Sequence, residues 1–344
     1  MLTADFRYTN PITEGLDPQG IRDCQIFRDG DRWCMTGTAW PFWFPQEVFG
    51  ILNPGVVLYD SSDLIHWRFV RILIPRPERH KWWYRRFWAP EIHRLKGRYY
   101  VTFNCCNPDI GIPDQHFGYA VGDSLEGPFE VVTDEKPLGM GNDLTLFEDE
   151  DGSVWAFWNR GRDFGIGFAP VDLAAGSLLA KPITAILPGS VEALAERDPK
   201  TGRTFRALEW DSEPIEGPFI FKREGTYYLL YSSPTRGYEI GCATSQKITG
   251  PWVKHPSNPW YGAQKPEFCK LHGIAFTGDL SHPFEQVGHN AVFTGPDGRL
   301  WLSCHGNLRS QPNFPMLVID PINFRLAGGI VQTPPTWTPQ QVRC

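Results

Sequence analysis

The stretch Glu213-Pro-Ile-Glu216-Gly-Pro-Phe-Ile-Phe221 leads into Glu224-Gly-Thr-Tyr-Tyr-Leu-Leu-Tyr231. A carboxylate precedes a short apolar run, a glycine-containing turn follows, and the next residues alternate between two faces with a period of two. This order predicts a β-hairpin with one acidic side chain, Glu216, at the entrance of its first strand.

The same order of polar residue, apolar run, glycine turn and aromatic strand occurs four more times. The other copies cover residues 23–38, 91–103, 143–158 and 289–304. Successive turn glycines are 55 to 73 residues apart, which leaves room for long loops in each repeat. A third strand repeats as well, because residues 119–130 and 242–253 both run into a Gly-Pro-aromatic sequence.

Five such units predict an all-β fold, a five-bladed β-propeller that occupies residues 1–344 as a single domain. Residues 1–20, rich in proline and glycine, are expected either to form an irregular lead-in or to close the last blade. The polar residue that heads each first strand is expected to point at the central axis. These residues are Asp23, Glu91, Asp143, Glu216 and His289.

The composition of the chain argues against several classes of partner. Its 344 residues carry a net charge of −6, and no basic stripe exists that could neutralise phosphates, so nucleic acid is not expected. No apolar run has transmembrane length and the N-terminus has no apolar signal segment, so we expect no membrane partner and a cytoplasmic location. The eight cysteines lie mostly in strand-like segments and form no C-x-x-C pair, which favours free thiols. The oligomeric state is left open.

Several carboxylates that meet at one axis repel each other and are partly desolvated. Any single one could cap a turn, but five polar residues at one place in five repeats favour a functional role. Carboxylates in a cleft walled by aromatic side chains suit the hydrolysis of glycosidic bonds. Glu216 lies among apolar residues that favour a protonated acid, whereas Asp23, next to Arg22, is better placed to stay ionised.

Nine short motifs follow one another over almost the whole chain. They are Arg22-Asp23, Phe27–Gly30, Thr36–Thr38, Phe87–Glu91, Asn142–Phe147, Glu216–Phe219, Tyr227–Tyr231, Gly288–Val292 and Asp320–Ile322. In this order they resemble the motifs of glycoside hydrolase family 43. The resemblance implies a five-bladed propeller and an inverting hydrolase. By position, it implies that Asp23 is the general base, that Asp143 modulates the pKa of the acid, and that Glu216 is the general acid.

The resemblance also covers the axial histidine and includes departures from the family pattern. His289 matches a histidine that in this family often orders a central water or calcium ion, so no cofactor is required and a structural Ca²⁺ is allowed. The family usually has proline after the base and after the modulator, where this chain has Cys24 and Leu144. Glu91 stands where the family more often has aspartate.

The candidates for substrate binding are aromatic, amide and basic residues: Trp40, Trp88, Asn142, Trp158, His289 and Arg309. Trp40 opens a loop with Phe42, Trp43 and Phe44 that either stacks against sugar faces or plugs the blade. The basic segment Arg76–Arg86 is either a solvated loop or a site for an anionic sugar.

Together these features predict an exo-acting glycosidase on oligosaccharides that carry terminal α-L-arabinofuranosyl or β-D-xylosyl residues. A related propeller hydrolase on galactofuranosides, galactosides, fructosides or anhydro-sugars is the second reading. A non-catalytic carbohydrate-binding propeller is the third, and the presence of Asp23, Asp143 and Glu216 together argues against it.

Overall fold

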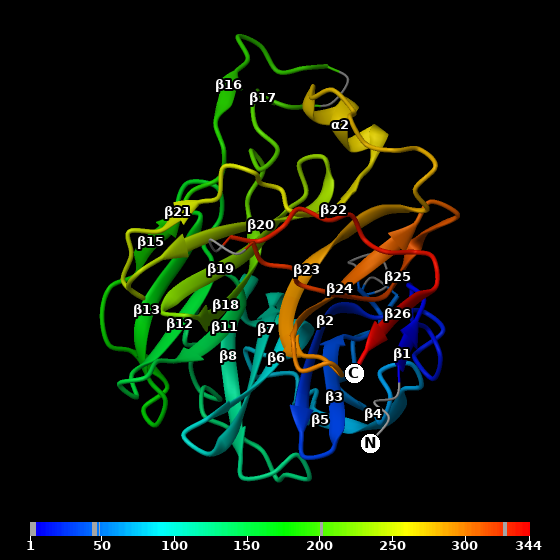
Figure 1. The fold of residues 1–344 in the computed structure, drawn as a ribbon. Helices are drawn as coiled ribbons and strands as arrows, with labels where there is room; N and C mark the ends of the chain where they lie inside the picture. The colour runs from blue at the N-terminus through cyan, green and yellow to red at the C-terminus, as the bar shows by residue number, and fades with distance from the viewer. Residues whose placement is uncertain (1–4, 43–46, 48, 200–201, 326–328) are drawn as a thin grey trace.

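The computed structural model describes residues 5–42, 47, 49–199, 202–325 and 329–344. Its strands form five sheets that radiate from one axis, so the predicted five-bladed β-propeller is confirmed (Figure 1). Each blade begins with its innermost strand and proceeds outwards through antiparallel hairpins. The turn glycines identified in the sequence, of which Gly30 and Gly298 are the first and last, have φ values from 61° to 82° that favour glycine.

The first three blades follow one another directly along the chain. Blade 1 contains β2 (Arg22–Asp29), β3 (Arg32–Thr38), β4 (Gly55–Ser61) and β5 (Arg68–Pro75). Blade 2 contains β6 (Arg85–Leu95), β7 (Arg98–Asn107) and β8 (Ile112–Gly122), with the short β9 (Glu130–Val131) and β10 (Gly139–Met140) paired to β8. Blade 3 contains β11 (Asn142–Glu148), β12 (Val154–Asn159) and β13 (Ile166–Asp172), with β14 (Ser177–Leu178) and β15 (Ile183–Ile186) paired to β13.

The last two blades are separated from their neighbours by longer excursions. Blade 4 contains β18 (Glu216–Arg223), β19 (Thr226–Ser233) and β20 (Gly237–Ser245), with β21 (Val253–Lys254) and β22 (Tyr261–Gln264) paired to β20. Blade 5 contains β23 (Phe284–Thr294), β24 (Leu300–Leu308) and β25 (Gln311–Pro321). The helical segments whose full bounds lie in the described residues are the 3₁₀ turn η1 (Pro108–Ile110) and the short helix α2 (Pro266–His272).

The excursions project from the propeller as a hairpin and a helix. The hairpin of β16 (Val191–Ala193) and β17 (Phe205–Ala207) stands beside α2 at the top of Figure 1. Helix α2 begins with a proline at its first position and ends at Gly273 in the left-handed conformation. His272 Nδ1 lies 3.0 Å from the carboxylate of Glu213, which ties the helix to the segment that leads into β18.

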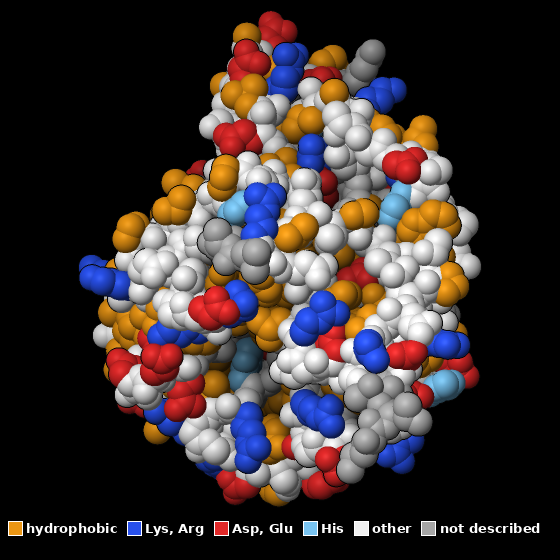
Figure 2. Space-filling view, viewed as in Figure 1, with side chains coloured by type: hydrophobic (Ala, Val, Ile, Leu, Met, Phe, Trp, Pro, Cys, Tyr) orange, Lys and Arg blue, Asp and Glu red, His pale blue; other side chains and the backbone are white. Residues whose placement is uncertain are grey.

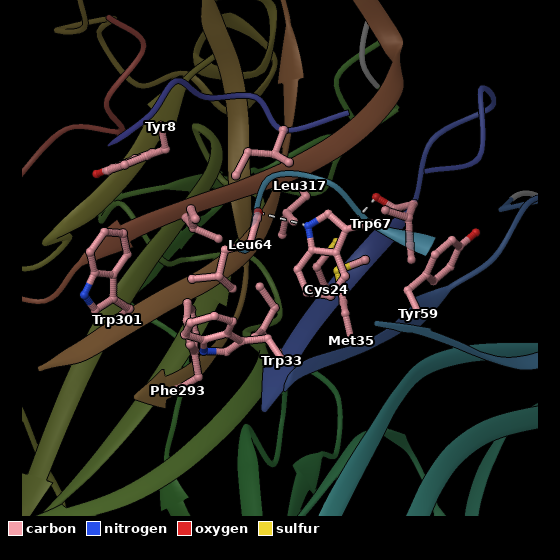
Figure 3. Packing of buried hydrophobic residues seen from close by; sticks show 14 of the residues in the cluster. Tyr8, Cys24, Trp33, Met35, Tyr59, Leu64, Trp67, Phe293, Trp301 and Leu317 are labelled. Atoms are coloured by element: carbon pink, nitrogen blue, oxygen red, sulfur yellow. Dashed lines mark hydrogen bonds between the residues drawn. The ribbon is translucent and has the colours of Figure 1, made fainter. Parts of the chain in front are cut away.

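The described part of the N-terminal segment closes the ring of blades. Of the two expectations for residues 1–20, closure of the last blade is therefore the one that the structure shows. Strand β1 (Asp5–Tyr8) pairs with β26 (Gln340–Arg343), and Ile12 forms a bridge to Leu317 in β25. Figure 3 shows the core beneath this closure, in which Tyr8 packs edge-on against Trp301 at 5.3 Å. The same cluster includes Cys24, so the residue that follows Asp23 is fixed in the seam between blades 1 and 5.

A buried carboxylate holds the two ends of the chain together. Asp320 accepts hydrogen bonds from the hydroxyls of Tyr8, Tyr261 and Thr336. Asn10 adds a bond to the carbonyl oxygen of Ile319. A buried acid with this many donors is satisfied without a counter-charge, which explains how the seam tolerates it.

Charged side chains of both signs lie on the face of the molecule shown in Figure 2. Acidic and basic side chains are interspersed over the described residues of the face shown in Figure 2, as the modest net charge suggests. In the described part of the chain, no helix has the length and hydropathy needed to cross a membrane.

Candidate active site

Every first strand of the propeller contains a β-bulge at the same level of the axis. The ladder register breaks between Arg22 and Gln25, Trp88 and Glu91, Asn142 and Thr145, Glu216 and Phe219, and Gly288 and Ala291. In each break the first unpaired residue has a left-handed φ of 43° to 60°; these residues are Asp23, Ala89, Asp143, Gly217 and His289. A bulge bends its strand and re-aims a side chain, and bulges are frequent beside active sites.

The bulges also connect neighbouring blades, because the unpaired N–H groups leave the ladder. The N–H of Asp23 donates to His305 Nδ1, and that of His289 donates to Ser232 Oγ. The N–H of Ala89 donates to Thr38 Oγ1, and that of Gly217 donates to a carboxylate oxygen of Asp143. Each of these four bonds reaches a side chain of the preceding blade, so the bulges align the blades around one pocket.

That pocket has a volume of about 120 Å³ and lies at the axis. Most of the described residues that line it belong to the bulges or stand just before them: Arg22, Asp23, Trp88, Asn142, Asp143, Glu216 and His289. The other two are Thr38, the last residue of β3, and Phe42, which follows that strand. Three carboxylates therefore share one small cavity with an indole and a phenyl ring.

Asp23 is buried and held as an anion. Thr38 Oγ1 donates a 2.6 Å hydrogen bond to Asp23 Oδ2, while Oδ1 lies 3.3 Å from His289 Nδ1. Burial opposes ionisation, but His289 and Arg22 outweigh it and hold the pKa of Asp23 well below its usual range. Asp23 is therefore a carboxylate near neutral pH, which a general base requires.

Asp143 has the opposite electrostatic environment. Burial raises the pKa of Asp143 to about 7, and the nearby charges of Glu216 and Asp23 act in the same direction, while His289 opposes them. The single hydrogen bond from Gly217 N–H, 3.0 Å long, does not compensate for the loss of solvent. Asp143 can therefore hold a proton near neutral pH beside the carboxylate of Glu216.

His289 is buried next to the carboxylates, which favour its charged form. Burial lowers the pKa of His289, but Asp23, Asp143 and Glu216 outweigh it and raise the pKa above its usual value. His305 differs, since burial and Arg22 lower its pKa to about 4. Its Nδ1 accepts the Asp23 N–H bond, which requires the neutral ring with its proton on Nε2.

A chain of contacts joins the expected base to the expected acid. Asp23 Oδ1 lies 3.3 Å from His289 Nδ1, which lies 3.3 Å from the hydroxyl of Tyr238, and that hydroxyl donates a 2.6 Å bond to Glu216 Oε1. The two carboxyl groups therefore lie closer than roughly 9.5 Å, the upper end of the range for inverting glycosidases.

Comparison of the sequence with known protein families agrees with the geometry of this pocket. The sequence profile described as Glycosyl hydrolases family 43 matches residues 8–328. This chain belongs to glycosyl hydrolases family 43. The resemblance found from the motifs alone is thereby confirmed.

Relatives of this family-43 chain include enzymes named for pentoses. It is 27% identical over 312 residues to the xylosidase/arabinosidase 43B of Humicola insolens, covering 85% of this chain and 48% of that protein. It is 23% identical to a non-reducing end alpha-L-arabinofuranosidase of Bacteroides ovatus, covering 88% of this chain and 48% of that protein. The chain thus spans about half the length of these relatives.

The fold matches solved structures over nearly its full length. The crystal structure of a thermostable family-43 glycoside hydrolase superimposes with a TM-score of 0.73 at 22% identity, covering 98% of this chain and 99% of that chain. This likeness supports the five-bladed propeller.

The two departures from the family-43 pattern do not disturb the bulges. Cys24 and Leu144 are fully buried in the seams beside blades 1 and 3. Asp23 and Asp143 keep their left-handed φ values of 54° and 60° before these residues. Cys24 and Leu144 therefore leave the bulge conformation of the preceding carboxylates in place.

Glu91 does not reach the pocket. It is the residue after the bulge of blade 2, at the ladder position that Gln25 occupies in blade 1, so it lies in the next layer along the axis. There its carboxylate lies 2.8 Å from His93 Nε2. The residue of blade 2 that lines the pocket is Trp88, whereas Ala89 contributes only backbone.

The expected substrate-binding residues divide into two groups. Trp88, Asn142 and His289 line the pocket. Trp40, Trp158 and Arg309 are not among the described residues that line it. Trp158 is buried against Phe117, with ring centroids 5.1 Å apart, and Arg309 donates to the carbonyls of His282 and Gln264. From the aromatic loop, Phe42 lines the pocket, while Trp43 and Phe44 lie outside the described residues.

The basic segment Arg76–Arg86 is largely neutralised by carboxylates. Arg79 and Arg85 both bind Asp109, Lys81 binds Asp134 and Glu135, and Arg86 pairs with Glu47 at 3.3 Å. This pairing supports a structural role for the segment rather than the binding of an anionic sugar.

Three functional neighbours of the carboxylates were missed from the sequence: Thr38, Tyr238 and His305. They lie on second and third strands, where one polar residue in an aromatic run does not reveal whether it faces the axis. The Thr36-Gly-Thr38 motif was noted, and its second threonine was the available signal.

The described residues do not form a direct calcium site. No three His, Cys, Asp or Glu side chains within them come together as a metal site. Calcium takes about six to eight oxygen ligands, whereas the axis offers an imidazole and carboxylates already engaged by Thr38, Tyr238 and Gly217. A calcium ion near His289 would depend mainly on water and stays a prediction from the family resemblance.

Proposed function

We propose that this chain is an inverting, exo-acting glycoside hydrolase that removes terminal α-L-arabinofuranosyl or β-D-xylosyl residues from plant-type oligosaccharides. The observation that carries the proposal is the cavity of about 120 Å³ in which three carboxylates meet. Sites for drug-sized ligands measure roughly 300 to 1,000 Å³, so this cavity suits one sugar ring rather than a polymer.

The residues of the pocket divide the work of hydrolysis. Asp23, kept ionised by His289 and Arg22, takes a proton from the water that attacks the anomeric carbon. Glu216 gives its proton to the leaving oxygen, and Asp143 helps to keep that proton on the pair near neutral pH. Trp88 and Phe42 supply apolar walls against which a sugar face can lie.

The names of the relatives support the choice of glycone. One is named for both xylosides and arabinosides, another for arabinofuranosides at the non-reducing end, and a third, from a Vibrio species, is a xylan 1,3-beta-xylosidase. A pentose has one carbon and one hydroxyl fewer than a hexose, which agrees with the small volume of the cavity.

A panel of aryl glycosides tests the proposal. We expect cleavage of 4-nitrophenyl α-L-arabinofuranoside or β-D-xyloside by the wild-type chain, and none by Asp23→Ala prepared in parallel. If the protein cleaves only galactosides or fructosides, the proposed glycone is wrong and the sugar that is cleaved takes its place. Silence on all substrates, with the pentoses bound, would favour a carbohydrate-binding propeller instead.

A further inference from the structure

A tyrosine from the third strand of blade 4 contacts the expected acid. Tyr238 lies at the start of β20, and its hydroxyl donates a 2.6 Å hydrogen bond to Glu216 Oε1. The side chain is buried and is not among the residues that line the pocket. It therefore acts on Glu216 from behind, without access to a sugar.

The ring of Tyr238 lies against two residues of blade 5, Gly288 and His305. A Cβ atom built on Gly288 would lie only 2.5 Å from Cδ1 of this ring, so the absence of a side chain at 288 gives the ring its place. The His305 ring lies near it, with centroids 5.4 Å apart and planes inclined by 32°. Gly288 and His305 are cross-strand partners in blade 5, so blade 5 positions a residue of blade 4.

The hydroxyl donates its hydrogen bond to Glu216. Burial and the charge of Glu216 raise the pKa of Tyr238 well above its usual value, so the phenol keeps its proton. It has one proton to donate, and that proton is directed at Oε1. Oε2 is then the oxygen left to carry the acid proton towards the leaving group.

The same hydroxyl lies 3.3 Å from His289 Nδ1, the imidazole that faces Asp23. The position of the acid is therefore tied to the side chain that stabilises the base. A shift of the Tyr238 ring would move Glu216 relative to Asp23, and misplacement of a catalytic group by about 1 Å costs on the order of a hundredfold in rate.

We propose that Tyr238, seated on Gly288, is the positioning residue of the general acid, because it binds Oε1 of Glu216 and leaves Oε2 to protonate the leaving group. This inference rests on the proposed glycosidase function. It adds a residue whose effect depends on how much protonation the leaving group needs.

The test compares Tyr238→Phe with Tyr231→Phe. Tyr231 is a matched control because it is buried in the adjacent strand of blade 4 and donates to a carboxylate, Asp211, 3.0 Å away. For each protein, kcat is measured on a natural oligosaccharide and on the dinitrophenyl glycoside of the same sugar. The ratio of the two rates does not depend on the folded fraction of a preparation.

For Tyr238→Phe we expect kcat on the oligosaccharide to fall about ten- to a hundredfold, the usual effect of losing a hydrogen bond to a charged group. On the dinitrophenyl glycoside, which needs no protonation, the fall should stay within about threefold. KM should change little on either substrate. Tyr231→Phe should leave the ratio of the two rates at the wild-type value.

Gly288→Ala provides a second variant that does not touch the hydroxyl. Its methyl group would displace the Tyr238 ring, so it should reproduce the leaving-group dependence of Tyr238→Phe. Equal losses on both substrates for Tyr238→Phe, or no loss on either, would overturn the proposal while leaving the glycosidase function intact. Failure of the wild-type protein to cleave any glycoside would overturn the function and this inference with it.

Discussion

Asp23 and Glu91 are both buried carboxylates on the innermost strand of their blade, yet only Asp23 reaches the pocket. Asp23 is the unpaired residue of its bulge, with a φ of 54°, whereas Glu91 follows the bulge and has returned to the ladder opposite Thr102. A shift of two residues relative to the bulge therefore moves a carboxylate from the pocket to the layer beneath it. The placement of the bulge, more than the order of residues along the repeat, decides which side chains meet.

The largest expected effect is the difference in kcat between a substitution of Asp23 and a substitution of Glu91. Asp23→Ala should lose at least about 10³ in kcat on both natural and dinitrophenyl glycosides, because water must be activated whatever the leaving group is. Glu91→Gln, which keeps the shape of a buried side chain beside His93, should retain kcat within about tenfold. Steady-state kinetics measure both. A loss as large for Glu91→Gln would contradict the division into two layers.

Glu216 extends the comparison to blade 4, where the acid stands just before the bulge residue Gly217. Glu216→Ala should lose about 10² to 10⁴ in rate on a natural glycoside and much less on a dinitrophenyl glycoside. The comparison of the two substrates measures this. Equal losses on both would remove the acid role and make Glu216 a binding residue.

The change of the hydrolysis rate with pH should be smaller than these losses, and it should depend on the carboxyl groups of the pocket. Burial raises the pKa of Asp143 to about 7, so the proton of Asp143 is present below that pH and lost above it. The rate should therefore fall as pH rises through about 7, while Asp23 stays ionised far below it. Asp143→Asn removes the group whose pKa is raised to about 7, so the alkaline limb of kcat/KM should move away from that pH, to lower values. An upward shift or an unmoved limb would contradict the coupling.

The smallest expected effect is that of removing metal ions from the protein. Because the described residues form no metal cluster, treatment with a chelator and readdition of calcium should leave kcat and Tm unchanged. Kinetics and thermal melts of the treated protein measure this. A loss of rate that calcium restores would place an ion beside His289, held through water.

Much of the fold could be predicted because each hairpin is determined by residues close together in the sequence. Each blade carries its own glycine turn, such as Gly30 or Gly225, and its own alternating strand, so five copies specify five blades. The roles of Asp23, Asp143 and Glu216 as pocket residues followed from their place in these repeats, and the structure brings all three together.

What the sequence did not reveal depends on contacts between blades. The bulges shift the alignment of the repeats by one or two residues, which is why Glu91 was expected at the pocket and is not there. Tyr238 contacts Glu216 from another strand, and its position depends on Gly288 in the next blade. Trp158 has the composition of a sugar platform but packs inside the seam of blades 2 and 3, since only the register of its strand determines its direction.

The central claim is that the bulges place Asp23 and Glu216 on either side of one sugar, as base and acid of a single displacement. Following the anomeric proton of the released sugar by NMR in the first minutes of hydrolysis tests it most directly. A product formed first with the anomeric configuration opposite to that of the substrate is the predicted result, since a water activated by Asp23 attacks the face opposite the leaving group. A product that first appears with the configuration retained would contradict the account, because Asp23 would then act as a nucleophile rather than as a base.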